Sequence, residues 1–160
     1  MQISDLLQEK HIVQRLTSHK LSDLFASMVN HLADLGEIDN RQEIIDHLVE
    51  REKLGSTGLM GGYAIPHTYP PHLHETILMV GICPGGLDFK LRDHEPVHVV
   101  FLLLGSPDRK IDHIRLLAAI SRTIRAPWLH EALLEADSAQ EVLQRIHQAE
   151  AESFQTCLNA

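Results

Sequence analysis

The sequence is poor in cysteine and in cationic residues. Its two cysteines, Cys83 and Cys157, lie far apart, one in an apolar run and one near the carboxyl end. They form neither a CxxC zinc pair nor a disulfide framework. The 14 Lys and Arg residues are outnumbered by 22 Asp and Glu, which gives a formal charge of -8. Because nucleic-acid binding depends on cations that neutralise phosphates, this balance argues against DNA or RNA as a partner.

Membrane and targeting segments are also missing from the pattern. No apolar run reaches the length of a membrane span, and residues 1–16 carry charges without a basic leader or an apolar signal core. We therefore expect a cytoplasmic protein without direct membrane insertion. The 160 residues fit one domain, since domains commonly run to about 100–200 residues. We predict a domain over residues 1–154 and a tail over residues 155–160.

Apolar residues at helical spacing predict several amphipathic helices. A first helix starts near Leu21 and stops at Gly36, and a second covers Arg41–Glu52 with Asn40 placed to cap it. The carboxyl half adds three more predicted helical segments: Lys110–Arg125, His130–Leu134 and a last helix from Ala139, where Ser138 and Glu141 form a capping box.

Apolar runs between these helices predict strands. They are Ile12–Leu16, Tyr63–Ile65, Ile77–Cys83 and Val97–Leu104, with a turn at Pro84–Gly86 and a short extended piece at Leu87–Arg92. The run at Val97–Leu104 is nearly continuous, as in a strand buried on both faces. Helices and strands interleave without a strict βαβ rhythm. The predicted fold is α/β, a single domain with a mixed sheet of four to five strands flanked by helices.

The segment Arg51–His67, REKLGSTGLMGGYAIPH, is the best candidate for a functional site. Two glycine clusters break regular structure, and Pro66 then favours an extended chain that displays His67 at a strand end. A histidine at neutral pH can act as a base, a metal ligand or a nucleophile. If His67 accepted a phosphoryl group, the phosphate oxygens would need donors, for which Arg51, the amides of the glycine turn and His113 are suitable.

A purely structural interpretation is equally open on this chemistry alone. In it, His67 merely ends a strand, Arg51 pairs with Glu52 or Asp46, and the glycines only make a turn. No Gx4GK[ST] loop or GxGxxG fingerprint is present to indicate nucleotide binding.

Twelve histidines keep metal binding open as an alternative function. The pair His72 and His74 is the candidate, although its i, i+2 spacing in a proline-bearing loop is a weak ligand pattern. His94 and His98, on either side of Pro96, are expected to be structural or solvated.

The residues around His67 resemble a known family. The run Arg51–Gly58 followed by Gly62–His67 is similar to the enzyme IIA domain of the phosphoenolpyruvate-dependent sugar phosphotransferase system, of the fructose, mannitol and nitrogen-regulatory type. The resemblance continues through Gly86–Phe89, Pro96-Val97 and Asp112-His113, and it covers most of residues 5–145.

This resemblance implies a phosphotransferase component with a mannitol-type enzyme IIA fold. In it, His67 accepts a phosphoryl group on Nε2 from an HPr-like histidine phosphocarrier protein and passes it to a IIB domain or holds it as a regulatory signal. Arg51 and His113 are the implied active-site partners, and Thr57 is an implied pocket residue. The resemblance further implies that the domain binds no metal and no nucleotide cofactor.

Two questions about output follow from the resemblance. Because no IIB or IIC segment is fused to the chain, the nitrogen-regulatory branch is favoured over sugar transport. The alternative, from another class, is a regulatory binding module in which phosphorylation of His67 alters docking without onward transfer.

Overall fold

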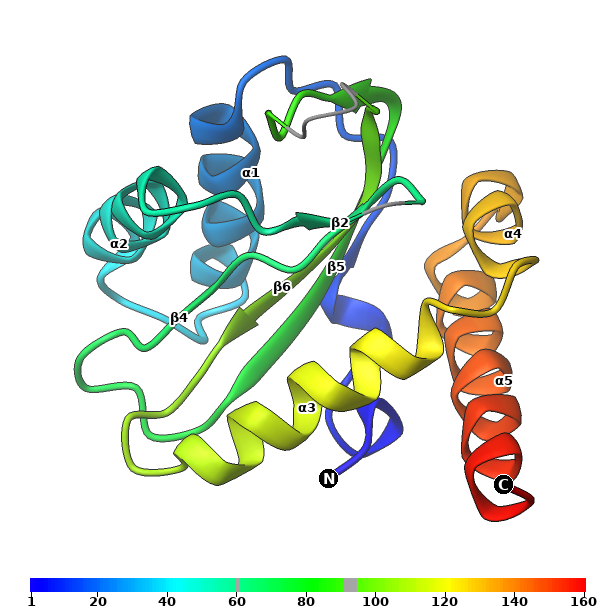
Figure 1. The fold of residues 1–160 in the computed structure, drawn as a ribbon. Helices are drawn as coiled ribbons and strands as arrows, with labels where there is room; N and C mark the ends of the chain where they lie inside the picture. Colours follow the sequence, from blue (N-terminus) through cyan, green and yellow to red (C-terminus); the bar gives the residue numbers. More distant parts are fainter. Residues whose placement is uncertain (60, 91–94) are drawn as a thin grey trace.

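The computed structural model describes residues 1–59, 61–90 and 95–160. Figure 1 shows its elements in chain order. They are the 3-10 helices η1 (Ile3–Asp5) and η2 (Glu9–His11), then β1 (Ile12–Val13), α1 (Leu21–Asp34), α2 (Arg41–Lys53), β2 (Gly58–Leu59), β3 (Tyr63–Ala64), β4 (His67–Thr68), β5 (Ile77–Leu87), β6 (Val97–Leu104), α3 (Lys110–Thr123), α4 (Leu129–Glu135) and α5 (Ala139–Leu158).

A long antiparallel pair, β5 and β6, forms the centre of a mixed sheet. The strand order is β1-β5-β6-β3-β2, and β4 also pairs with β6. Strand β1 runs parallel to β5, strands β3 and β4 run parallel to β6, and β2 runs antiparallel to β3. The mixed α/β sheet flanked by helices confirms the predicted fold class. Within the described residues the sheet has six strands, because the segment 58–68 contributes three strands of two residues each.

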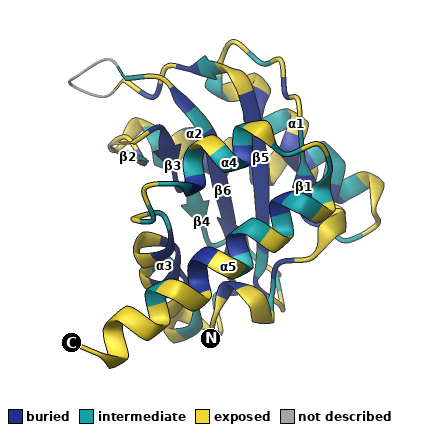
Figure 2. Ribbon diagram, turned by 90° about the vertical axis from the view of Figure 1, so that its right-hand side faces the viewer, coloured by how far each residue is buried: buried dark blue, intermediate teal, exposed yellow. Residues whose placement is uncertain are grey.

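Side chains of the central strands alternate between two cores. Val99, Phe101 and Leu103 pack with α3, α4 and α5 on one face. Val100, Leu102 and Leu104 pack with α1 and α2 on the other. Alternation follows from the two-residue period of a strand. Figure 1 shows the resulting three layers, and Figure 2 shows the buried central strands between partly exposed helices.

The turn predicted at Pro84–Gly86 is wrong, because these residues lie inside β5. The register between β5 and β6 shifts between Ile82 and Leu87. Gly86 adopts a φ of 78° there. A bulge accommodates a proline that cannot donate to the ladder and a glycine with positive φ. The extended piece predicted at 87–92 is therefore partly the end of β5, while residues 91 and 92 lie outside the described ranges.

The helix ends test the predicted capping residues. Ser138 accepts a hydrogen bond from the Glu141 amide at 3.1 Å, which is one half of the predicted capping box. The Glu141 carboxylate accepts the amide proton of Asp137 at 3.0 Å rather than that of Ser138. Asn40 does precede α2, but its side chain makes no cap and instead donates to the Glu43 carboxylate at 3.1 Å. Helix α5 continues beyond Phe154 to Leu158, and residues 155–160 are exposed (Figure 2). No helix in the described residues is long and apolar enough to cross a membrane.

A buried carboxylate holds the amino terminus against α5. Glu150, which is 6% exposed, accepts the amide protons of Ile3 at 2.5 Å and Ser4 at 2.9 Å. Ile3 is fully buried among core residues from α3 and α5. Glu150 therefore satisfies two backbone donors that the folded N-terminal segment removes from water.

We expect Glu150→Ala to lower the free energy of unfolding by about 1–3 kcal/mol, because the Ile3 amide would be buried without an acceptor. Urea unfolding at neutral pH measures the change. The matched control is Gln144→Ala, an exposed position of the same helix, which should stay within about 0.5 kcal/mol of the parent. Equal stability of the two variants would show that the Glu150 contacts contribute nothing.

Candidate functional site

His67 lies where β4 pairs with the end of β6. It is registered opposite Leu103, and the Leu103 amide donates to the Pro66 carbonyl at 3.0 Å. Pro66 is buried and has no backbone N–H, so its carbonyl is the only backbone group with which it can pair with β6. His67 itself is half-buried. The local sequence thus fixes the backbone and leaves the imidazole partly accessible, as expected for a displayed histidine.

One hydrogen bond determines which ring nitrogen of His67 is available. Nδ1 lies 2.7 Å from the Ile65 carbonyl oxygen. A carbonyl oxygen can only accept, so in the neutral imidazole Nδ1 carries the proton and Nε2 keeps its lone pair. The site therefore presents Nε2 as a base, ligand or nucleophile.

His113 is brought beside His67 from the first turn of α3. The centroids of the His67 and His113 rings lie 5.5 Å apart. The centroid of the Tyr69 ring lies 4.3 Å from that of His113. Gly105 makes this approach possible, since a Cβ there would come within 2.2 Å of His113 Nδ1. His113 is 1% exposed, and among the described residues neither of its ring nitrogens has a hydrogen-bond partner.

Burial controls the charge of His113. Two causes lower the pKa of His113 to about 4: the larger is desolvation by burial, and the smaller is repulsion from His67. The ring is therefore neutral at neutral pH and can offer one N–H and one lone pair.

Arg51 supplies a positive charge near the same strand. It lies in the last turn of α2, which packs against β4, and its side chain is partly exposed. Its Nη1 donates to the Gly55 carbonyl at 3.1 Å. The ion pair with Glu52 or Asp46 that a purely structural interpretation requires is absent from the described residues.

Thr57 and Glu52 form a contact that the sequence reasoning missed. Glu52 accepts the Thr57 amide proton and hydroxyl proton, each at 2.8 Å. The Thr57 carbonyl in turn accepts the Ile65 amide at 3.1 Å. A carboxylate five residues before a buried threonine, across a helix end, is the only sequence signal for this contact. Thr57 is 8% exposed, and its hydroxyl proton is committed to Glu52.

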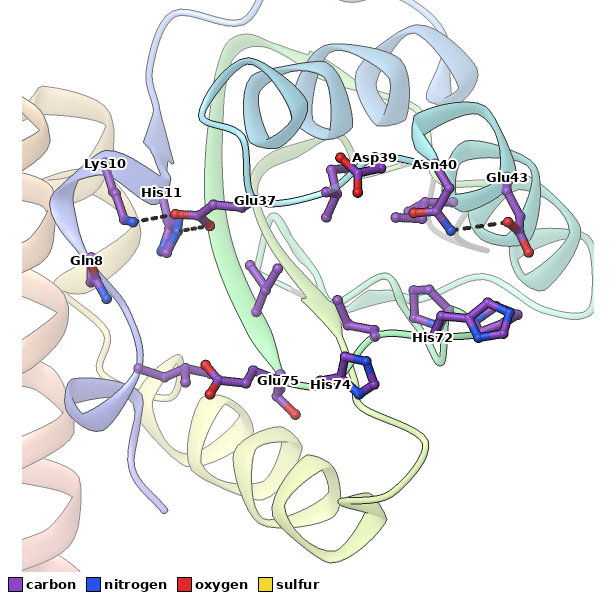
Figure 3. A pocket seen from close by; sticks show the side chains of 18 residues that line it. Gln8, Lys10, His11, Glu37, Asp39, Asn40, Glu43, His72, His74 and Glu75 are labelled. Atoms are coloured by element: carbon purple, nitrogen blue, oxygen red, sulfur yellow. Dashed lines mark hydrogen bonds and ion pairs between the residues drawn. The ribbon is translucent and has the colours of Figure 1, made fainter.

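The histidine pair proposed for metal binding lies elsewhere. His72 and His74 line a cleft of about 740 Å³ between η2, the start of α2 and the loop after β4 (Figure 3). Carboxylates of Glu37, Asp39 and Glu75 face the same cleft. Within the described residues, no group of three or more His, Cys, Asp or Glu side chains is arranged to hold a metal ion. His94 is outside the described ranges.

Large apolar side chains are exposed on the two helices that carry Arg51 and His113. Leu54, directly after α2, is 85% exposed. Ile111 and Ile114 on α3 are 67% and 63% exposed and lie on either side of His113 in sequence. These exposed apolar side chains therefore lie close in sequence to two of the candidate site residues, Arg51 and His113.

Comparisons with known proteins identify relatives along almost the whole chain. The family model "Phosphoenolpyruvate-dependent sugar phosphotransferase system, EIIA 2" matches residues 5–149. A nitrogen regulatory protein of Bradyrhizobium diazoefficiens is 30% identical over 142 residues, which cover 89% of this chain and 92% of the relative. A fructose-specific EIIA component of Haloferax volcanii is 33% identical over 109 residues, or 68% of this chain and 71% of the relative.

One relative is much longer than the chain. The fructose-specific EIIABC component of Bacillus subtilis is 27% identical over 148 residues, covering 92% of this chain but 23% of that protein. The chain thus spans about a quarter of this relative.

Solved structures share the fold. The nitrogen regulatory protein IIA-Ntr of Neisseria meningitidis superposes with a TM-score of 0.82 at 26% identity, covering 90% of this chain and 98% of the other. Enzyme IIAMtl of Escherichia coli, solved in complex with phosphorylated enzyme IIBMtl, gives a TM-score of 0.75 at 17% identity, covering 89% and 97%.

We expect the His113 ring to titrate near pH 4 in the folded protein, which NMR of histidine-labelled protein would measure. The unfolded chain, whose His113 titrates near 6.5, then binds the proton first as pH falls. The contribution of His113 to stability is therefore fully present above pH 6.5 and is lost as the pH falls from there to about 4. His113→Gln assigns the resonance and should flatten that decline. A His113 titration near 6.5 would contradict the prediction.

Proposed function

This chain belongs to the EIIA 2 family of the phosphoenolpyruvate-dependent sugar phosphotransferase system, and we propose that it carries a phosphoryl group on Nε2 of His67. One observation supports this assignment above others. The Ile65 carbonyl holds the Nδ1 proton at 2.7 Å, so the lone pair for a new P–N bond resides on Nε2. His67 is also partly exposed, as an acceptor for a second protein must be.

The transfer step requires little covalent chemistry from the protein. The P–N bond of a donor phosphohistidine breaks, its electron pair returns to the donor imidazole, and the Nε2 lone pair of His67 forms the new P–N bond. Catalysis then consists of positioning and of stabilising charge on the three phosphoryl oxygens. No carboxylate pair or Ser-His-Asp set is needed for such a step.

Arg51 and His113 are the residues that we assign to the phosphoryl oxygens. Arg51 uses one N–H on Gly55, which leaves further guanidinium donors for the oxygens. The neutral, buried His113 has ring nitrogens without partners, 5.5 Å from His67 between ring centroids. A phosphoryl oxygen bound at His67 would provide an acceptor for the N–H of His113. Thr57, the implied pocket residue, follows by two positions Gly55, whose carbonyl accepts the Arg51 hydrogen bond.

The partner proposed for the donor step is an HPr-like histidine phosphocarrier protein. The exposed side chains of Ile111 and Ile114, on either side of His113 in sequence, and of Leu54, three residues after Arg51, are the apolar groups that we assign to contact with the carrier. We assign residues 1–154 to the phosphoryl-acceptor domain and residues 155–160 to an exposed tail. We place this exchange in the cytoplasm, where phosphoenolpyruvate is available.

For the output we favour a nitrogen-regulatory role over onward transfer to a IIB domain. The Bradyrhizobium diazoefficiens relative, 92% covered by the alignment, is a nitrogen regulatory protein. In such a role the phosphoryl dianion changes the docking surface. The second candidate is transfer to a IIB domain in sugar uptake, which the fructose-specific relatives and the IIAMtl complex with phosphorylated IIBMtl favour. Rapid transfer of the label to an added IIB domain would favour the transport role, whereas a long-lived phosphorylated form would favour the regulatory role.

We expect His67→Ala to abolish labelling when the protein is mixed with phosphocarrier protein, its phosphoenolpyruvate-dependent kinase and labelled phosphoenolpyruvate. The variant removes the only assigned acceptor nitrogen. His72→Ala, an exposed histidine in the following loop, is the control and should label like the parent. Labelling of His67→Ala at the parent level would refute the assignment of the acceptor.

Arg51→Ala is expected to slow labelling roughly 100-fold, the usual loss when one donor to a charged transition state is removed. Arg51→Lys should fall between the two, because it keeps the charge and loses the planar fork. Rates come from a quenched-flow time course, and circular dichroism checks that each variant is folded. An unfolded Arg51→Ala protein would make Arg51 structural.

A further inference from the structure

We propose that Glu52 is a positioning residue for His67, acting through Thr57 and Ile65 to hold the imidazole as the Nδ1–H tautomer with Nε2 free. This inference rests on the proposed function of His67. It concerns a residue that touches neither the imidazole nor the assigned phosphoryl site.

The first link joins the end of α2 to the glycine-rich turn. Both carboxylate oxygens of Glu52 are used, one on the Thr57 amide and one on the Thr57 hydroxyl, each at 2.8 Å. Thr57 is buried, so water competes poorly for its donors. Hydrogen bonds to an ionised acceptor are stronger than neutral ones, and two of them fix both the backbone and the side chain of Thr57.

The second link runs from Thr57 to the reactive ring. The Thr57 carbonyl accepts the Ile65 amide at 3.1 Å, and the Ile65 carbonyl accepts His67 Nδ1–H at 2.7 Å. Ile65 is thus held at its amide while its carbonyl points to the ring. Pro66, the next residue, restricts Ile65 to extended conformations and leaves it few other orientations. A shift of Thr57 therefore moves the acceptor that selects the His67 tautomer.

Arg51 ties the same turn to the phosphoryl site. Its Nη1 donates to the Gly55 carbonyl at 3.1 Å, two residues before Thr57. Consecutive residues of α2 therefore bind the two sides of one turn: Arg51 at Gly55 and Glu52 at Thr57. Loss of the Glu52 contacts would loosen the turn toward His67 and toward the guanidinium together.

The pairing of β2 with β3 is a second restraint on this segment. Gly58 is registered opposite Ala64 and Leu59 opposite Tyr63. These contacts hold the hairpin when Glu52 is changed, so the variants should fold. The expected effect is on the orientation of the Ile65 carbonyl and the His67 ring rather than on the fold.

The test uses Glu52→Gln and Thr57→Val, with Thr57→Ser as the conservative variant that keeps the hydroxyl. The matched control is Glu50→Gln, an exposed carboxylate on the same helix that pairs with Lys53. The first readout is the ring ¹⁵N shifts of His67, which distinguish Nδ1–H from Nε2–H without any phosphoryl chemistry. The second readout is the rate of labelling from the phosphocarrier protein, and thermal melting checks the fold.

We expect Glu52→Gln and Thr57→Val to raise the Nε2–H population of His67 and to slow labelling by roughly 10- to 100-fold, as small misplacements of reacting groups do. Thr57→Ser and Glu50→Gln should match the parent in both readouts. Slower labelling with an unchanged tautomer would overturn the inference, and so would parent-like behaviour of both variants. If the parent fails to label on His67 while the tautomer still shifts, the proposed function fails and the positioning by Glu52 stands.

Discussion

The positions of the helices and of the candidate site depend on one constraint, the burial of the β5–β6 strand pair on both of its faces. Neighbouring residues of β6 face opposite cores, so the pair cannot slip by one residue without exchanging every contact. Helix α2 is thereby fixed on one face and helix α3 on the other, and β4 is registered on the end of β6. Arg51, His67 and His113 come from these three elements. The candidate site is thus assembled where two otherwise separate cores meet at one strand.

At this site, burial removes water from His113 and thereby keeps its imidazole neutral at neutral pH. His113 is packed between His67 and Tyr69, against Gly105, with both ring nitrogens unpartnered. An unpaired buried polar group is costly, and such costs are characteristic of functional sites whose surroundings are well determined. The result is one neutral imidazole beside a second imidazole, with one partly exposed guanidinium on the neighbouring helix. The permanent positive charges nearby are the Arg51 guanidinium and the Lys110 ammonium, which lies 5.6 Å from the centroid of the Tyr69 ring. An incoming phosphoryl dianion therefore meets cations at the rim of the site and a neutral His113 in its interior.

Sequence reasoning succeeded where the cause was local. The position of His67 after Pro66, the last-turn position of Arg51 and the Ser138 cap all depend on residues within a few positions of one another. The proximity of His113 to His67 came from family resemblance, since nothing local connects α3 with β4. The turn predicted at Pro84–Gly86 failed because pairing with β6 carries the strand through a bulge and overrides the local turn preference. The predicted cap by the Asn40 side chain is wrong, because a short polar side chain has several partners in reach and Asn40 donates to Glu43 instead. The contact of Glu52 with Thr57 was missed, because the fold of the glycine-rich turn brings these two residues together.

The hydrogen bonds from the Ile3 and Ser4 amides to Glu150 hold the amino terminus against α5, so both ends of the chain lie on one side of the molecule. Met1 and Gln2 line a small hollow with Ser153 and Phe154 of α5, and Figure 1 shows both ends at the same side. A second domain joined at either end would therefore be tethered from the same side of the molecule. Its effective concentration at His67 would be set by the length and stiffness of the linker, and hardly by the order of the domains in the gene.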